Sequence, residues 1–73
     1  MRIIVSDHAL RRLRNPRQAG IAMSDLHAAA GSLPGKITVA TRFRNFRGQS
    51  GRRFDIVVKD IAKGRLIITV IGR

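Results

Sequence analysis

The chain has 73 residues, which is enough for one domain but near the size at which a single hydrophobic core is only marginally sufficient. It carries 15 lysines and arginines against four aspartates and no glutamate, so its net charge is +11. Its hydrophobic share of 44% supports folding, yet the longest largely apolar run, residues 66–71, is too short to span a bilayer. We expect one domain over residues 1–73, a monomer or a homodimer, with no membrane partner.

Arginine dominates the basic residues, because only Lys36, Lys59 and Lys63 are lysines. A guanidinium group binds phosphate through two parallel hydrogen bonds and stacks on bases, so the charge indicates nucleic acid rather than membrane. The absence of cysteine excludes disulfides, thiolate zinc sites and a cysteine nucleophile. The N-terminal residues lack the pattern of a signal peptide, and we expect a cytoplasmic protein.

The sequence predicts a strand, two helices and three further strands. In chain order these are a strand at 2–5, helices at about 7–14 and 22–30, and strands at 36–44, 52–59 and 65–71. Ser6 is a suitable N-cap for the first helix, and Asn15-Pro16 ends it. The segments "GQSG" and "AKG" provide hairpin connections between the last three strands. We expect an α+β fold in which an N-terminal strand and two helices pack on a twisted antiparallel sheet.

Alternation along the last three strands predicts which side chains face the helices. The expected core-facing residues are Ile37, Val39, Thr41 and Phe43, then Phe54, Ile56 and Val58, then Leu66, Ile68 and Val70. If both helices cover that face, the other face carries Arg42, Arg44, Arg53, Asp55, Lys59 and Thr69. Such a basic platform can hold a single strand of nucleic acid. The alternative is a solvated face whose arginines resist edge aggregation.

The stretch "RFRNFRGQSGRRF", residues 42–54, concentrates this charge. It holds five arginines and all three phenylalanines of the chain, without a carboxylate. Concentrated like charge repels itself, and a polyanion or an acidic partner relieves that repulsion. Phe46, near the hairpin turn, is the aromatic residue best placed to stack on a base. The nucleic-acid-binding residues that we predict are Arg42, Arg44, Phe46, Arg47, Arg52 and Lys59.

His8 is the candidate for acid–base chemistry. It lies in the first turn of the first helix, and Arg12 is four residues later on the same flank. A histidine beside an arginine can hold a phosphate and move a proton; the alternative is a histidine that only caps the helix or lies on its surface. His27 fits a surface position in the second helix. Two histidines and four scattered aspartates give no metal-ligand spacing, so we expect neither a metal nor another cofactor.

Several short motifs resemble a family of small prokaryotic domains of uncharacterised function. Its members have a His-Ala-x-x-Arg helix, a second helix that begins with Gly-Ile, and a last strand with Ile-Thr-Val. The corresponding residues are His8-Ala9, Arg12, Gly20-Ile21 and Ile68-Thr69-Val70. Residues 41–73 also resemble the sheet of RelE/ParE-type toxins. Both groups are placed in the barnase–EndoU–colicin–RelE assemblage of small RNase folds.

The resemblance implies a RelE-like fold and a site formed by His8, Arg12, Arg53 and Thr69. It implies a toxin-like, metal-independent endoribonuclease in which an RNA 2′-hydroxyl attacks the adjacent phosphate. His8 would be the acid/base, the two arginines would stabilise the phosphorane, and Thr69 would orient the phosphate. The implied partners are RNA, free or on the ribosome, and an acidic antitoxin. The alternatives are a non-catalytic binder of nucleic acid or of an acidic protein, and a ParE-like toxin that acts on a protein.

Overall fold

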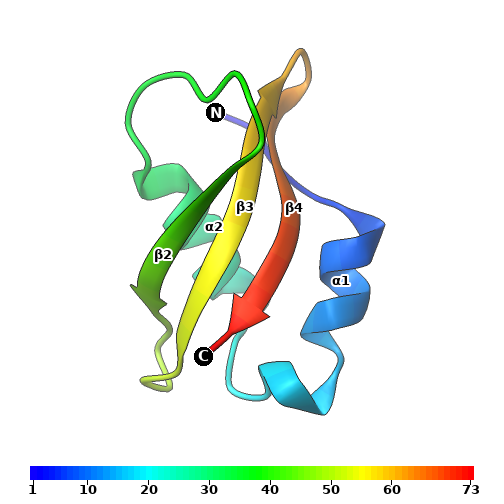
Figure 1. The fold of residues 1–73 in the computed structure, drawn as a ribbon, viewed down its shortest axis with the longest axis vertical. Coiled ribbons are helices and arrows are strands. Elements are labelled where there is room, and N and C mark those ends of the chain that lie inside the picture. Colours follow the sequence, from blue (N-terminus) through cyan, green and yellow to red (C-terminus); the bar gives the residue numbers. More distant parts are fainter.

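The computed structural model describes residues 1–73 and has an α+β fold, as the sequence predicts (Figure 1). Its elements are β1 (Ile3–Val5), α1 (Asp7–Leu13), the 3₁₀ helix η1 (Pro16–Gln18), α2 (Met23–Ser32), β2 (Thr41–Arg47), β3 (Arg53–Ile61) and β4 (Gly64–Gly72). The four strands form one sheet in the order β1-β4-β3-β2. Neither α-helix has the length and apolar composition that crossing a membrane requires.

The sheet is mixed, so the expected antiparallel sheet is confirmed for its last three strands only. β2, β3 and β4 form an antiparallel meander, whereas β1 pairs parallel with β4, with Ile3 opposite Arg65 and Val5 opposite Ile67. The meander leaves the outer edge of β4 free, and β1 occupies only its first part. A parallel direction lets the chain continue from Val5 along the same edge into α1. A three-residue strand carries no sequence signal for this choice.

The two helices pack against different parts of the sheet, one against a face and the other along an edge. α2 lies behind β2 and β3 in Figure 1, whereas α1 lies beside the edge of β4, so the expectation that both cover one face was wrong for α1. Side chains in and near α1 make hydrogen bonds with the backbone groups along this edge of β4. Ser6 Oγ donates to the Ile68 carbonyl at 2.7 Å, Arg12 Nε donates to the Val70 carbonyl at 2.7 Å, and Gln18 Oε1 accepts from the Gly72 N–H at 2.7 Å. The edge of β4 is therefore closed to a further strand.

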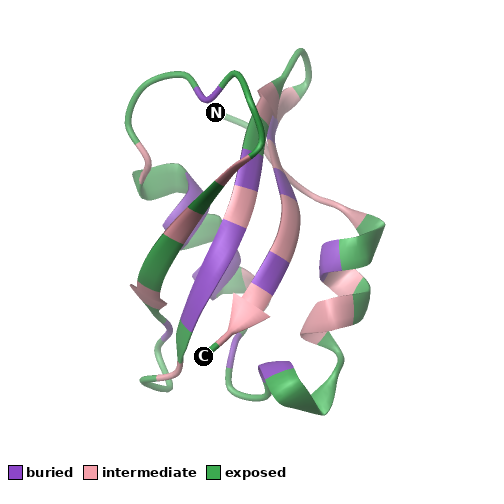
Figure 2. Ribbon diagram, viewed as in Figure 1, coloured by how far each residue is buried: buried purple, intermediate pink, exposed green.

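The core lies between α2 and the sheet (Figure 2). Leu26, Ala29 and Ala30 of α2 are buried against residues of β3 and β4. The buried strand residues are Phe54, Ile56, Val58, Ile67 and Val70. Since these side chains point toward α2, their neighbours in β3 point to the opposite, helix-free side of the sheet.

A bulge in β4 changes the expected pattern of its side chains. Val57 pairs with Thr69 and the next residue, Val58, pairs with Ile67, which leaves Ile68 as the extra residue. Ile67 is therefore buried and Ile68 is half-buried. The prediction that Leu66 and Ile68 face the core was wrong, because strict alternation does not anticipate an inserted residue. Leu66 pairs with Lys59 on the other face.

The segment expected to begin the second strand is instead a loop. β2 begins at Thr41, and residues 36–40 cross from the end of α2 to the sheet. Asp60 holds this loop, because its Oδ2 accepts the Ile37 N–H at 2.8 Å and its own N–H donates to the Ile37 carbonyl at 2.7 Å. Val39 is therefore exposed rather than core-facing, while Ile37 is buried as expected.

Candidate nucleic-acid interface

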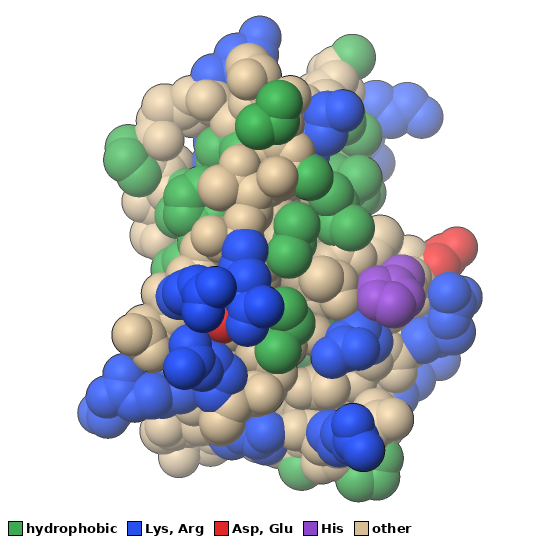
Figure 3. Space-filling model, in the orientation of Figure 1, with side chains coloured by type: hydrophobic (Ala, Val, Ile, Leu, Met, Phe, Trp, Pro, Cys, Tyr) green, Lys and Arg blue, Asp and Glu red, His purple; other side chains and the backbone are tan.

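No helix covers the face of the sheet opposite α2, which we call the open face. The strand register places Arg42 beside Val57 and Thr69, and it places Arg47 beside Arg53. Basic side chains gather on this face over β2 and β3, around a single acidic side chain (Figure 3). We define the arginine cluster as the exposed residues Arg42, Arg44, Arg47, Arg53 and Arg73.

Asp55 is the acidic residue at the centre of the cluster, and its side chain is fully buried. Its Oδ2 accepts hydrogen bonds from Arg42 Nε at 3.0 Å and from Arg42 Nη2 at 2.7 Å. Arg73 Nη1 approaches the same oxygen at 3.4 Å. The Asn45 backbone N–H donates to Oδ1 at 3.0 Å. One carboxylate thus contacts the Arg42 guanidinium and the Asn45 N–H of β2 and the Arg73 guanidinium after β4.

A bulge in β2 allows the backbone to reach this carboxylate. Phe43 pairs with Ile56 and Phe46 pairs with Phe54, so Arg44 and Asn45 together oppose Asp55 alone. Asn45 has φ of 67°, a left-handed conformation that asparagine tolerates better than most residues. The bulge directs the Asn45 N–H to Asp55 and leaves the arginines on both sides of it exposed.

The surroundings of Asp55 keep its carboxylate ionised. Burial alone would raise the pKa of Asp55, but the Asn45 N–H, the hydrogen bonds from Arg42 and the charge of Arg73 act against it and lower the pKa overall. The five positive charges of the arginine cluster and this one negative charge leave a local net charge of +4. Arg44, Arg47 and Arg53 make no ion pair, so most of this charge faces solvent.

The open face also has an apolar part next to the arginine cluster. Val57 and Ile71 neighbour Arg42 and Asp55 in the register, and Leu66 lies further along β4. All three are half-buried rather than buried, so they present apolar surface beside the charges. In Figure 3 apolar side chains adjoin the basic group on this face. Phosphates and bases of one strand can therefore contact neighbouring parts of the same surface.

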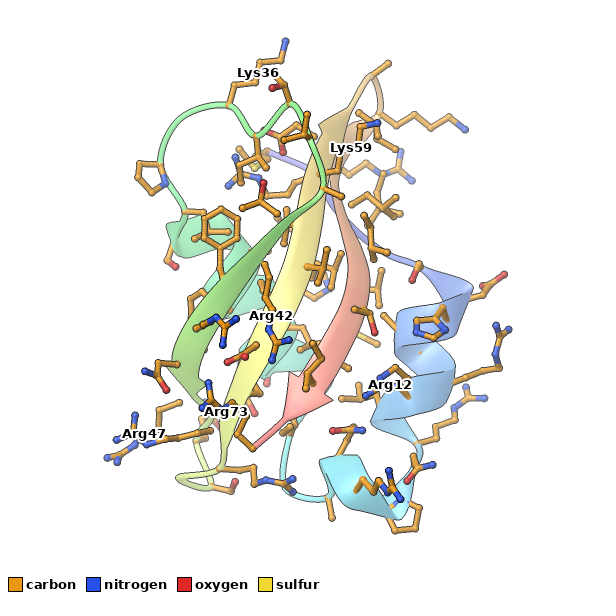
Figure 4. All side chains as sticks on the ribbon, viewed as in Figure 1. Arg12, Lys36, Arg42, Arg47, Lys59 and Arg73 are labelled. Atoms are coloured by element: carbon orange, nitrogen blue, oxygen red, sulfur yellow. The ribbon has the colours of Figure 1, made fainter.

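Lys59 belongs to the open face but not to the arginine cluster. It pairs with Leu66, four residues along β3 from Asp55, which separates the two backbones by about 13 Å. Figure 4 shows Lys59 at one end of the sheet and Arg42, Arg47 and Arg73 toward the other. The expected common platform therefore contains the arginines, with Lys59 apart from them.

Arg52 and Phe46, two predicted contact residues, serve the fold. The Arg52 guanidinium donates to the carbonyls of Arg17, Ala19 and Arg73 at 2.5, 2.8 and 3.0 Å, which holds the η1 loop against the end of β4. Phe46 lies on the α2 side of the sheet and stacks on Phe54, with ring centroids 5.8 Å apart. The expectation that Phe46 stacks on a base at the basic face was therefore wrong, because the β2 bulge returns it to the core-facing side.

A pocket of about 400 Å³ lies on that other side, between α2 and the end of β2. Ala28, Ala29, Phe46 and Phe54 are among its lining residues. Asp25, also in its wall, is committed to the fold, since its carboxylate accepts the N–H groups of Ala22 and Gln49. Arg47 is the one member of the arginine cluster among the residues that line this pocket.

The residues predicted for catalysis are only partly brought together. His8 is exposed in the first turn of α1, and Arg12 is fixed to the Val70 carbonyl, next to Thr69. Thr69 lies on the open face opposite Val57. Arg53 lies four residues along β3 from Val57, about 13 Å away at the backbone. Figure 4 shows Arg12 on α1 and Arg42 over β3. The strand β4 therefore lies between Arg12 and the arginine cluster.

Sequence reasoning missed two members of the site. Arg73 stood outside the predicted strands, yet it meets Asp55 at the centre of the arginine cluster. Asp55 was expected on the open face but was given no role. The available signal was that it is the one acidic residue with outward parity among unpaired arginines. No group of three or more histidine and aspartate side chains lies close enough together to hold a metal ion.

Comparison with known protein families, with characterised proteins and with solved structures finds no match to this chain. The fold and the site together define a small, basic α+β domain with an uncovered, arginine-rich sheet face.

Proposed function

We propose that this protein binds single-stranded RNA across the open face of its sheet. The observation that supports this most directly is the arginine cluster, which has a local charge of +4 on rigid strands and no covering helix. Proteins that bind single strands combine a positive surface for the backbone with flat surface for the bases. Arg44, Arg47 and Arg53 offer unpaired guanidinium groups for phosphates, and Val57, Leu66 and Ile71 offer apolar surface for bases.

We further propose that the domain is RelE-like and that it cleaves the bound RNA as a toxin-like endoribonuclease. Neutral His8 would take the proton of a 2′-hydroxyl, whose oxygen attacks the adjacent phosphorus. The bond from phosphorus to the 5′-oxygen then breaks, and His8 returns the proton to that oxygen. Arg12 would stabilise the phosphorane charge and Thr69 would orient the phosphate. Because Arg53 lies further along β3, we assign it to a neighbouring phosphate.

The position of Arg12 supports this assignment. Its Nε donates to the carbonyl of Val70, the residue after Thr69, so the guanidinium is held at the edge of β4 rather than moving freely in solvent. His8 precedes Arg12 by one helical turn and is exposed. Under this proposal, an RNA strand that leaves the arginine cluster toward α1 would meet an acid–base group, a cation and a hydroxyl in His8, Arg12 and Thr69.

The experiment compares the wild type with His8→Ala and with the matched control His27→Ala, since His27 is an exposed histidine on α2. Positioned acid–base help contributes about 100- to 10,000-fold, so His8→Ala should remove most cleavage and keep RNA affinity. His27→Ala should cleave normally. The assay should include both free transcripts and translating ribosomes, and products should end in a 2′,3′-cyclic phosphate.

A non-catalytic binder is the second candidate, and one observation favours it. His8 makes no hydrogen bond to another side chain, whereas an acid–base histidine is usually oriented by a partner. Under this reading the same face would bind RNA or an acidic protein such as an antitoxin. Wild-type protein that binds RNA but leaves every transcript intact, with and without ribosomes, would support the binder and reject the enzyme.

A further inference from the structure

We propose that Asp55 is a positioning residue that fixes Arg42 and Arg73 as one clamp for a single phosphate group. The inference rests on the proposed RNA-binding function and extends it, because it names one phosphate contact and the residue that shapes it. Asp55 itself would touch no RNA. Its effect would pass through the two guanidinium groups.

The exposure of the three side chains supports this arrangement. Asp55 is fully buried, while the side chains of Arg42 and Arg73 are 39% and 44% exposed. The two arginines therefore cover the carboxylate on one side and face solvent on the other. They come from β2 and from the end of β4, and only Asp55 on the intervening β3 joins them.

The hydrogen-bond inventory leaves donors free for a ligand. A guanidinium has five N–H donors, and Arg42 uses two of them, one on Nε and one on Nη2, for Asp55. Three donors remain on Arg42, and Arg73 contacts the carboxylate through Nη1 alone. Two guanidinium groups with free N–H groups, held over one point, match the several oxygens of a phosphate better than separate flexible arginines do.

Positioning and simple charge predict opposite effects of Asp55. A free arginine loses side-chain freedom when it binds, whereas one already held by a carboxylate has lost much of that freedom beforehand. The negative charge of Asp55 also repels an approaching phosphate, however, so its removal would strengthen binding if charge alone mattered. The sign of the change in affinity therefore decides between the two roles.

Asp55→Asn tests this sign, since asparagine keeps the shape of the side chain and removes its charge. We expect affinity for a short single-stranded oligoribonucleotide at fixed salt to fall roughly three- to tenfold, because charge-assisted hydrogen bonds to the clamp are lost. Asp7→Asn makes the same change of net charge at an exposed position on α1, and it should leave affinity unchanged or slightly raised. Tighter binding by Asp55→Asn would overturn the proposal. Circular dichroism and thermal melting establish that each variant is folded.

A second pair of variants decides the matter if Asp55→Asn does not fold. Lysine keeps the charge but has no planar fork, so Arg42→Lys cannot hold Asp55 through two hydrogen bonds and also face a phosphate. Arg44→Lys changes a neighbouring arginine that has no acidic partner. We expect roughly tenfold weaker binding for Arg42→Lys and less than about twofold for Arg44→Lys. Equal losses in the two variants would overturn the clamp.

Inorganic phosphate separates this inference from the RNA-binding proposal. In a titration followed by NMR of arginine Nε–Hε groups, Arg42 and Arg73 should shift together and at lower phosphate concentration than exposed Arg2 and Arg11. If wild-type protein shows these shifts but does not bind RNA, the clamp stands and the RNA proposal fails. If phosphate shifts no arginine, or shifts all four alike, the clamp is overturned whatever RNA does.

Discussion

Arg65 and Asp60 face each other inside the fold, with Arg65 Nε 2.7 Å from Asp60 Oδ1 and Arg65 Nη2 3.1 Å from Oδ2. Arg65 is fully buried, and its other donors bind the carbonyls of Ala30, Leu33 and Gly35. A buried charge is tolerated when it is paired and hydrogen-bonded throughout. This ion pair therefore joins the β3–β4 hairpin to the end of α2. Arg65 thus uses its guanidinium inside the fold, whereas the arginines of the arginine cluster are exposed to solvent.

Arg65→Ala should destabilise the protein strongly. It removes the partner of Asp60 and leaves the carbonyls of Leu33 and Gly35 without a donor, while the Ala30 carbonyl keeps only the Leu33 N–H at 3.4 Å. Breaking a buried ion pair costs about 3–5 kcal/mol, a large part of the stability of a small domain. Denaturant unfolding measures the change, with Arg11→Ala as the control because Arg11 is exposed on α1. A loss in Arg65→Ala no larger than in Arg11→Ala would contradict the structural role of the pair.

Stability should depend on pH through the same pair. The hydrogen bonds from Arg65 and from the Ile37 N–H lower the pKa of Asp60 to about 2, whereas an unfolded aspartate has a pKa of about 3.9. The unfolded state then binds more protons between these values, so this stabilisation is present above about pH 4 and is lost as pH falls toward 2. The lowered pKa of Asp55 acts in the same direction. Unfolding between pH 2 and 7 should show a smaller acid-induced loss in Asp60→Asn than in wild type.

Much of the fold follows from patterns visible in the sequence. Ser6 caps α1 as expected, through a hydrogen bond from the Ala9 N–H, and the apolar alternation of Phe54, Ile56 and Val58 gives the correct core face of β3. The same apolar alternation gave the wrong core face for the first half of β4. Its bulge exchanges the faces of Leu66 and Ile67, and Arg65 becomes buried because Asp60 and three carbonyls satisfy it. Alternation cannot reveal a partner that only the tertiary structure supplies.

The site was predictable in part for a related reason. Outward parity placed Arg42 and Arg53 on the open face, because the β3 pattern is regular up to Val57. Arg52 was also predicted to contact nucleic acid, although its parity in the predicted strand is opposite to that of Arg53. Arg52 reaches the carbonyls of the η1 loop, which lies 33 residues earlier in the chain at Ala19, and local sequence says nothing of that approach. Long-range contacts therefore decide which arginines are free for a ligand.

Arg52 and Arg53 provide a matched pair of adjacent residues. Arg52→Ala should lower stability by roughly 1–2 kcal/mol, because three carbonyls lose their donor at a partly exposed position. Arg53→Ala should change stability by less than about 0.5 kcal/mol and weaken RNA binding. Thermal melting and fluorescence anisotropy separate the two effects. The reverse assignment of effects would show that Arg52, not Arg53, contacts RNA.

RNA affinity should depend steeply on salt. If Arg44, Arg47 and Arg53 each neutralise one phosphate of a single strand and the Arg42–Arg73 clamp neutralises a fourth, log affinity should fall against log salt with a slope of about −2.8, about −0.7 for each contact. Arg44→Ala should reduce the steepness by about 0.7, whereas Arg11→Ala on α1 should leave it unchanged. A slope near zero would indicate recognition through apolar contacts and would count against a phosphate-binding surface.

The most direct measurement maps a bound oligoribonucleotide by NMR of side chains, which report separately on the two sides of the sheet. RNA binding on the open face predicts the largest shifts at the Nε–Hε groups of Arg42, Arg53 and Arg73 and at the methyl groups of Val57 and Ile71. The methyl group of Ala28, on α2 behind the sheet, should stay unchanged. Shifts confined to Ala28 and Phe46 of the α2 pocket, with no shift at Arg42, Arg53 and Arg73, would contradict the account.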